Sequence, residues 1–173
     1  AGADSRARRA AQSALLHILQ SLTRLIAPVL SFTAEEIWSI LNPDHGKNDS
    51  VFLHIYHTLP VVADAANLQA RWSRLREIRA MALKSIEDQR TAGTIGSSLQ
   101  GELELSATGA DHNLLTSLGD DLRFVMITSK ALVQEAADEN AIGVKVAASS
   151  HPKCERCWHY RADVGSNAEH PTI

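Results

Sequence analysis

Apolar residues recur every three or four positions between residues 11 and 29, the spacing of one face of an α-helix. The positions in this stripe are Ala11, Leu15, Ile18, Leu22, Leu25 and Val29. Ser5 stands where a helix N-cap is expected, and Pro28 removes a backbone donor. We therefore predict a long amphipathic helix that begins after Ser5 and ends near Ile26 or Ala27.

A shorter helix is predicted to follow. Thr33 and Glu36 have the spacing of a capping box, in which two side chains bond the backbone at a helix start. The apolar positions of this helix continue to Leu41 and include Trp38, which we expect to lie in a core. Pro43 then ends the helix and opens a polar loop.

A second long helix is predicted after Asp64, a plausible N-cap, and before Gly93 and Gly96, which favour a helix end. One face of this helix is apolar, and Trp72 on that face is expected in the core. The apolar positions are Leu68, Trp72, Leu75, Ile78, Ala82 and Ile86. Basic residues occupy its other faces: Arg71, Arg74, Arg76, Arg79, Lys84 and Arg90.

The hydrophobic period changes to two in "SSLQGELELSA", where Leu99, Leu103 and Leu105 predict a strand. A short helix is expected in "DHNLLTSLG", stopped by Gly119. The β-branched stretches "DLRFVMITSKALVQEA" and "AIGVKVAAS" predict two more strands.

These elements predict a mainly α fold in three parts. A partial helical bundle covers residues 1–96, a small α+β unit covers residues 97–148, and a tail covers residues 149–173. The tail is rich in His and Cys and has too little apolar content to fold alone.

Composition narrows the possible functions. The chain has 173 residues, of which 45% are hydrophobic, and no apolar run approaches the roughly 18 residues of a membrane span. The net charge of −3 gives no overall basic signal for nucleic acid, although local patches can still bind it. Two cysteines, three positions apart, do not form a disulfide framework, which favours a reducing, cytoplasmic protein.

Both cysteines, Cys154 and Cys157, lie in "HPKCERCWHY". Zinc binds thiolates and imidazoles in tetrahedral sites, so the pair supplies two of four ligands, and His151, His159 and His170 are candidate nitrogen ligands. A redox pair would need a strand before it and a helix after it, which this region lacks. Inert cysteines are the third alternative.

The residues around the pair carry a resemblance. Cys-x-Arg-Cys-Trp followed by "HYRADVG" closely resembles the C-terminal zinc peptide of bacterial isoleucyl-tRNA synthetases. Residues 7–38, which include "APVLSFTAEEIW", resemble the anticodon-binding helical bundle of class I synthetases. "SVFLHIYHTLP", "GTIGSSLQGELEL" and "LGDDLRFVMITS" resemble the segments that follow in that family. The resemblance covers nearly the whole chain in the same order.

In that family a second Cys-x-Arg-Cys completes a four-cysteine zinc site after a spacer of 16 residues, the number that follows Cys157 here. The resemblance therefore implies zinc in the full-length protein and only a half-site, Cys154 and Cys157, in this chain. Without the other ligands, we expect the tail to be mobile or held only by neighbouring contacts.

The family attaches isoleucine to its tRNA with ATP, using "HIGH"-like and "KMSKS"-like motifs that do not occur here. The resemblance therefore implies a C-terminal fragment without catalytic residues. ATP and magnesium would act only through the catalytic domain. The implied partner is the tRNA specific for isoleucine, with no membrane or DNA partner, and the expected state is a cytoplasmic monomer. We expect the first residues to lie inside the anticodon-binding domain and to leave apolar surface exposed.

RNA recognition needs cations for phosphates and aromatic or guanidinium planes for bases. Our candidates are Arg71, Arg74, Arg79, Lys153, Arg156, Trp158 and Arg161. Further arginines on the first helix are Arg6, Arg8, Arg9 and Arg24. The alternatives are that the helix arginines are solvated and pair with acidic residues, and that Trp158 packs as the small core of the tail.

Two rival functions remain open at this stage. A DNA repair glycosylase of the formamidopyrimidine type has similar cysteine spacing, but its N-terminal catalytic proline is absent and its β-sandwich does not fit the helical first half. The other rival is a stand-alone RNA-binding or protein-interaction module built on a synthetase-like domain.

Overall fold

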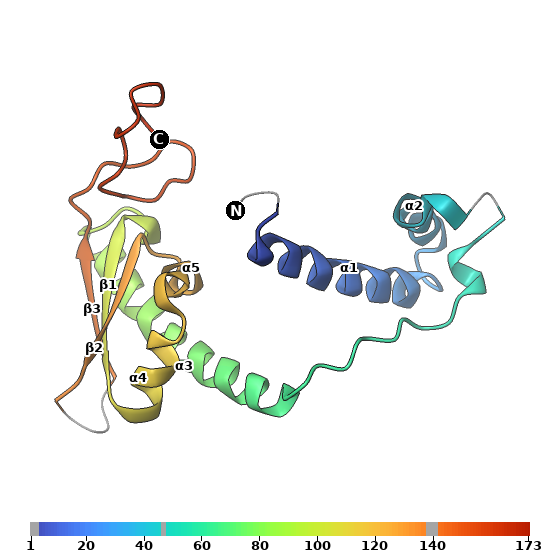
Figure 1. Cartoon of the computed structure of the whole chain (residues 1–173), viewed down its shortest axis with the longest axis horizontal. Helices are drawn as coiled ribbons and strands as arrows, with labels where there is room; N and C mark the ends of the chain where they lie inside the picture. Colours follow the sequence, from blue (N-terminus) through green and yellow to red (C-terminus); the bar gives the residue numbers. More distant parts are fainter. Residues whose placement is uncertain (1–3, 46–47, 138–141) are drawn as a thin grey trace. The chain divides into compact units, whose positions relative to one another are not determined.

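The computed structural model describes residues 4–45, 48–137 and 142–173, and its contacts divide the chain into two compact units. The first unit is Ala1–Ala63 and the second is Asp64–Ile173 (Figure 1). Within the described residues, no helix has both the length and the apolar character needed to cross a membrane.

Helix α1, Arg6–Ile26, opens the first unit and has the predicted ends. The Ser5 hydroxyl oxygen accepts a hydrogen bond from the Arg8 backbone N–H at 3.3 Å, as an N-cap does. Because Pro28 cannot donate to the preceding turn, the helix stops two residues before it.

Helix α2, Ser31–Leu41, begins earlier than the capping-box prediction, which was wrong. Thr33 lies inside the first turn and does not cap it. The Ser31 hydroxyl donates to the Ala27 carbonyl at 3.1 Å, and the Ala34 N–H donates to the Leu30 carbonyl at 2.8 Å. These bonds continue the helical path directly from the end of α1, so no separate cap is required.

The core of the first unit is small and centres on Trp38. It joins Ala27, Ala34 and Val51, the last of which lies in the short 3₁₀-helix η2, Val51–Leu53. Trp38 is 2% exposed, and its indole N–H donates to an Asp49 carboxylate oxygen at 2.7 Å. The prediction that Trp38 is a core residue is confirmed. Another 3₁₀-helix, η1, spans Pro43–His45.

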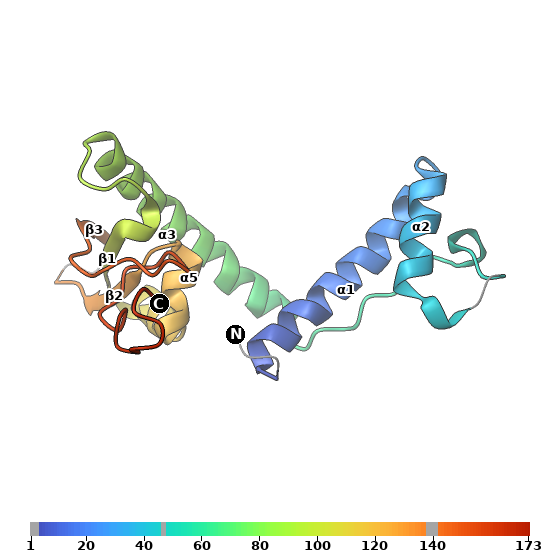
Figure 2. The same cartoon turned by 90° about the horizontal axis from the view of Figure 1, so that it is seen from above.

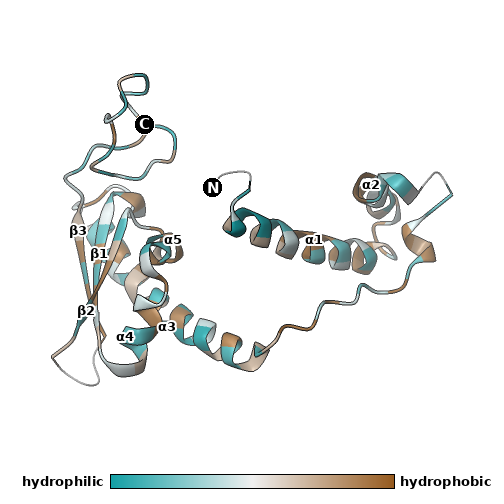
Figure 3. Ribbon diagram, in the orientation of Figure 1, coloured by the Kyte–Doolittle hydropathy of each residue, from teal (hydrophilic) through white to brown (hydrophobic). Residues whose placement is uncertain are grey.

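The apolar stripe of α1 contributes little to this core. Its large members are at least half exposed, and the expectation of exposed apolar surface is confirmed for the described residues. They are Leu15, Ile18, Leu22, Leu25 and, just after the helix, Val29. In Figure 3, hydrophobic and hydrophilic colours alternate along α1.

Helix α3, Ala65–Thr91, opens the second unit. Asp64 occupies the predicted N-cap position, but its side chain bonds the Asn67 side-chain amide at 2.9 Å and no backbone N–H of the helix. The helix ends before Gly93, which has the positive φ of 76° that favours glycine. Both predicted ends are therefore confirmed.

Only the later part of the α3 stripe is buried. Leu75 and Ile78, with Ala82 and Ile86 beyond them, lie in the core, whereas Leu68 and Trp72 are each 44% exposed. The prediction that Trp72 is a core residue was wrong. The first turns of α3 extend beyond the sheet, so they have little to pack against (Figure 1).

Three strands form one sheet with the order β2-β1-β3. They are β1, Gly101–Ala107, β2, Lys130–Glu135, and β3, Gly143–Ala148. Strand β1 pairs parallel with β2 and antiparallel with β3. The three predicted strands are confirmed, although Leu99 falls in the 3₁₀-helix η3, Ser98–Gln100. The predicted start of the third strand at Ala141 lies outside the described residues.

A helical connection joins the parallel strands β1 and β2. It consists of α4, Gly109–Thr116, η4, Gly119–Asp121, and α5, Leu122–Met126. The short helix predicted in "DHNLLTSLG" is confirmed as α4, whereas the prediction that residues 122–126 belong to a strand was wrong, because they form α5. Two parallel strands must be joined by a crossover connection. In this connection Leu122 and Met126 lie about one helical turn apart, and both are buried.

The second unit has two layers. Leu103, Leu105 and Ala107 of β1 pack against α3, α4 and α5 in one core. Helix α3 lies next to β3, and α5 next to β2 (Figure 2). Because α3 shares this core with the sheet, the structural division falls before Asp64. The predicted three-part domain boundaries stay a prediction.

Candidate zinc knuckle and nucleic-acid interface

The tail that follows β3 forms a small hairpin around the two cysteines. Lys153 and Tyr160 make an antiparallel bridge, and the Cys154 N–H donates to the His159 carbonyl at 2.8 Å. Across the turn, the Trp158 N–H donates to the Cys154 carbonyl at 2.9 Å. The hairpin, which we call the knuckle, spans residues 152–161.

The knuckle prepares Cys154 to act as a thiolate. The Cys157 backbone N–H donates to the Cys154 sulfur at 3.4 Å. This hydrogen bond is the main reason that the pKa of Cys154 lies below its ordinary value, and the Arg156 and Trp158 N–H groups lower the pKa further. Amide donors around a sulfur favour the thiolate, the form in which cysteine binds zinc. The cysteine pair therefore fits one half of a zinc site.

The described residues contain no group of three or more His, Cys, Asp or Glu side chains arranged to hold a metal ion. A structural zinc site needs four ligands. The ring of His159 packs edge-on against that of Phe124, with 5.6 Å between the ring centroids. The His151 Nε2 lies 4.0 Å from a Glu102 carboxylate oxygen. The candidate histidines thus do not complete the site.

Partly buried polar contacts hold the tail against η3 and the strands of the second unit, to which the tail itself belongs. The Ser149 N–H donates to the Gln100 carbonyl at 2.8 Å, and its hydroxyl donates to a Glu102 carboxylate oxygen at 2.7 Å. The Tyr160 N–H donates to the Ser129 hydroxyl oxygen at 2.6 Å. Contacts with neighbouring residues therefore hold the knuckle in place. This was one of the two outcomes expected for a tail without its other zinc ligands.

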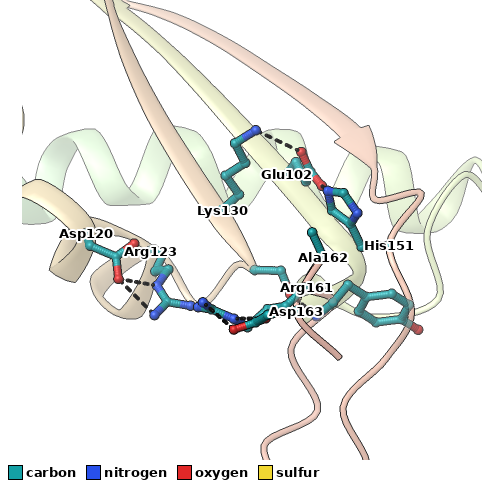
Figure 4. Close-up of a pocket in the computed structure, with 10 residues that line it drawn as sticks. Glu102, Asp120, Arg123, Lys130, His151, Arg161, Ala162 and Asp163 are labelled. Atoms are coloured by element: carbon teal, nitrogen blue, oxygen red, sulfur yellow. Dashed lines mark hydrogen bonds and ion pairs between the residues drawn. The ribbon is translucent and has the colours of Figure 1, made fainter. Parts of the chain in front are cut away.

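A cleft of about 310 Å³ opens where the tail crosses the ends of β1 and β2 (Figure 4). Its charged groups balance, since each cation has a carboxylate partner. The pairs are Arg123 with Asp120 at 2.9 Å, Arg161 with Asp163 at 2.8 Å and Lys130 with Glu102 at 3.7 Å. The cleft is therefore not a basic pocket.

The predicted RNA-binding arginines of α3 contact protein groups. The Arg71 guanidinium donates to the Ser117 hydroxyl at 3.0 Å, and that of Arg79 donates to the Val125 carbonyl at 2.7 Å. Arg74 donates to both carboxylate oxygens of Asp111, at 2.9 and 2.7 Å. Of the three, Arg74 has the acidic partner that the alternative expected, whereas Arg71 and Arg79 contact a hydroxyl and a backbone carbonyl. As RNA contacts, the three arginines stay predictions.

The turn of the knuckle, between the paired residues Lys153 and Tyr160, differs from the arginine-bearing faces of α3 in how exposed its side chains are. Trp158 has a positive φ of 64° and is 61% exposed, so it is not the buried core of the tail. The Lys153 ammonium lies over the Trp158 ring, 5.3 Å from its centroid. Arg156 is exposed and has no ion pair or side-chain hydrogen bond within the described ranges. Arg161 points elsewhere, into its pair with Asp163.

Sequence reasoning missed several residues that shape this region. Ser129 and Phe124 contact the knuckle but lie some 30 positions before it in the chain, in a segment interpreted as a strand. No local motif marks a serine that accepts a hydrogen bond from so distant a backbone group. Only the fold brings the two segments together.

Comparisons with known proteins give consistent results. Residues 1–106 match the family described as "Anticodon-binding domain of tRNA ligase", and residues 152–173 match "Zinc finger found in FPG and IleRS". Curated relatives named "Isoleucine--tRNA ligase" are similar over almost the whole chain. The protein of Azoarcus sp. (strain BH72) is 56% identical over 171 residues, and that of Burkholderia vietnamiensis (strain G4 / LMG 22486) is 55% identical over 171 residues.

In each case the match covers 99% of this chain and 18% of the relative. The chain therefore spans less than a fifth of the length of these relatives. The description of the zinc-finger family names both protein classes that the cysteine spacing allowed, whereas the description matched by residues 1–106 names tRNA ligase.

Proposed function

Because the chain belongs to the family of anticodon-binding domains of tRNA ligases, we propose that it is the tRNA-recognition region of an isoleucine–tRNA ligase. The whole enzyme attaches isoleucine to its tRNA with ATP and magnesium. That chemistry belongs to a catalytic domain outside this chain, and we assign no catalytic residue here. The partner is the tRNA specific for isoleucine, in the cytoplasm, and the protein acts as a monomer without a DNA partner.

The observation that carries this proposal is the exposed turn of the knuckle. Lys153, Arg156 and Trp158 combine two cations with an exposed aromatic ring. Single-stranded nucleic acid is bound by this combination, since cations contact phosphates and bases stack on aromatic faces. The arginines of α3, by contrast, would have to leave their protein partners before they could contact RNA.

In the full-length protein, Cys154 and Cys157 would supply two of the thiolates that hold a zinc ion, and the bound metal would order the turn that carries this surface. The amide groups of the turn would stabilise the negative charge on Cys154. Metal binding provides much of the folding free energy of such small peptides. In the proposed function, zinc has this structural role and takes no part in the reaction.

Salt-dependent binding of an isoleucine tRNA transcript tests the proposal. We expect affinity to fall steeply with salt, because contacts to phosphates release counterions. The double variant Lys153→Ala/Arg156→Ala should bind several-fold more weakly. Its slope of log affinity against log salt should be shallower by about 1.4, at roughly 0.7 per lost single-strand contact.

Lys84→Ala, which removes an exposed cation from α3, is the matched control and should leave both quantities unchanged. A transcript with an altered anticodon measures specificity in parallel. The proposal would be wrong if the wild-type affinity did not change between low and moderate salt. Equal binding by the wild type and the double variant would show that the knuckle turn does not contact the tRNA.

A further inference from the structure

Ser129, which directly precedes β2, is a buried polar residue that connects three segments. It is 5% exposed, and its backbone N–H donates to the Gly101 carbonyl at 3.1 Å. Its hydroxyl donates to the Leu99 carbonyl at 2.5 Å and accepts from the Tyr160 N–H at 2.6 Å. One hydroxyl thus joins the segment just before β1 to residues 159–161, which we call the second arm of the knuckle.

The neighbours of Ser129 hold the same arm of the knuckle. The ring of His159 meets Phe124 at 5.6 Å with an interplanar angle of 78°, an edge-on aromatic contact. Phe124 belongs to α5, which lies next to β2. Residues 159 and 160 are therefore fixed by groups from α5 and from the segment before β2.

Charges on the two sides of this contact are complementary. Asp120 comes from η4 and Arg123 from α5, whereas Arg161 and Asp163 come from the tail (Figure 4). Besides its own pair, Arg161 is attracted by Asp120, and Asp163 by Arg123. Alternating charges of this kind favour one placement of the tail over shifted ones.

The second arm of the knuckle determines where its first arm lies. Tyr160 pairs with Lys153, and the His159 carbonyl accepts from the Cys154 N–H. A shift of residues 159–161 therefore moves Lys153 and the turn that carries Arg156 and Trp158.

We propose that Ser129 is a positioning residue for the RNA contact of the knuckle. The inference rests on the proposed function, because it assumes that the knuckle turn binds tRNA. Ser129 itself is buried and does not contact RNA. Its hydroxyl fixes the direction in which Lys153, Arg156 and Trp158 face.

Three variants of the full chain test the proposal. Ser129→Ala removes the hydroxyl, Ser129→Thr keeps it, and Ser39→Ala is the control, removing a hydroxyl that bonds only within its own helix. In Ser129→Ala we expect amide exchange at Tyr160 at least tenfold faster while β1 stays protected. Binding of the isoleucine tRNA transcript should weaken about as much as in Lys153→Ala/Arg156→Ala. Ser129→Thr should restore most of the affinity, and Ser39→Ala should match the wild type.

Tyr160→Pro removes the same hydrogen bond from the tail side, because proline has no N–H, and leaves the core of the sheet intact. It should weaken tRNA binding to a similar degree even if Ser129→Ala folds poorly. Combining Ser129→Ala with Lys153→Ala/Arg156→Ala should add little further loss, because residues that act through one another are not additive.

Two results would overturn the inference, and they are distinguishable. If Lys153→Ala/Arg156→Ala weakens binding while Ser129→Ala and Tyr160→Pro do not, the knuckle binds RNA without positioning by Ser129. If Lys153→Ala/Arg156→Ala binds as tightly as the wild type, the proposed RNA contact fails, and the positioning role fails with it. Faster exchange at Tyr160 would then report only on how the tail is held.

Discussion

At the scale of single residues, neighbours decide what a charged side chain does. Arg74 looks in the sequence like any basic residue on a helix, yet it forms a fork with Asp111 and a second pair with Glu77 at 2.6 Å. Bidentate pairs of this kind have fixed geometry and are stronger than single contacts. The hydrogen bonds with Asp111 and then Glu77 raise the pKa of Arg74, and the bond from Arg74 lowers the pKa of Asp111.

A pH dependence of stability follows from Asp111. Its pKa is lower in the folded chain, so the unfolded chain binds more protons in acid. The stabilisation is present above the ordinary aspartate pKa of about 4 and is lost as the pH falls through the folded value. We expect Asp111→Asn to flatten the fall of the melting temperature below about pH 4.

The matched variant is Arg74→Gln combined with Asp111→Asn. The melting temperature of this double variant should depend on pH at least as strongly as that of Asp111→Asn alone, because the Arg74–Asp111 ion pair is already absent in both. Thermal unfolding followed by circular dichroism across the acid range measures both. An Asp111→Asn profile that parallels the wild type would show that the ion pair does not stabilise the fold.

At the scale of elements, the same hydrophobic period has different consequences at the two ends of one helix. Leu68 and Leu75 both lie on the predicted stripe of α3, but Leu68 is 44% exposed and Leu75 is 2% exposed. Periodicity identifies the face of a helix, whereas burial requires a neighbour along that face. Along this stripe, Leu75 is the first residue that belongs to the core shared with the sheet, α4 and α5.

These two leucines give a matched stability test within one helix. Leu75→Ala leaves a cavity in the core and should lower the free energy of unfolding by about 2–5 kcal/mol. Leu68→Ala should change it by less than about 1 kcal/mol, as is usual for partly exposed positions. Urea denaturation of both variants measures the difference. Equal losses would mean that the start of α3 is packed in solution.

At the scale of the whole molecule, the described residues form two cores that share no member. The first contains Ala27, Ala34, Trp38 and Val51, and the second consists of residues between Leu75 and Met126 with partly buried neighbours. Helix α3 belongs to the second unit because its buried face lies on the sheet. Each core can therefore form from its own stretch of sequence.

We expect a fragment of residues 64–173 to fold alone. All members of its core lie within it, and β1 keeps both of its partner strands. Its amides in β1 should stay protected from exchange, and its melting temperature should lie within a few degrees of the corresponding transition in the full chain. Loss of cooperative unfolding in the fragment would show that the first unit is needed to stabilise the second.

The sequence by itself determined the local structure and the family. The ends of α1 and α3, the three strands and the knuckle spacing depend on groups within a few residues of one another, and local patterns report such groups well. The cysteine pair and the segments before it also gave the resemblance that the comparisons confirmed.

Tertiary structure alone decided what is buried and which residues are partners. The exposure of Trp72, the helical α5 and the contact between Arg79 and Val125 depend on segments far apart in the chain. The bond between Ser129 and Tyr160 depends on the same kind of distant approach. Burial and buried hydrogen bonds arise only when distant segments meet, and a periodic pattern contains no information about that meeting.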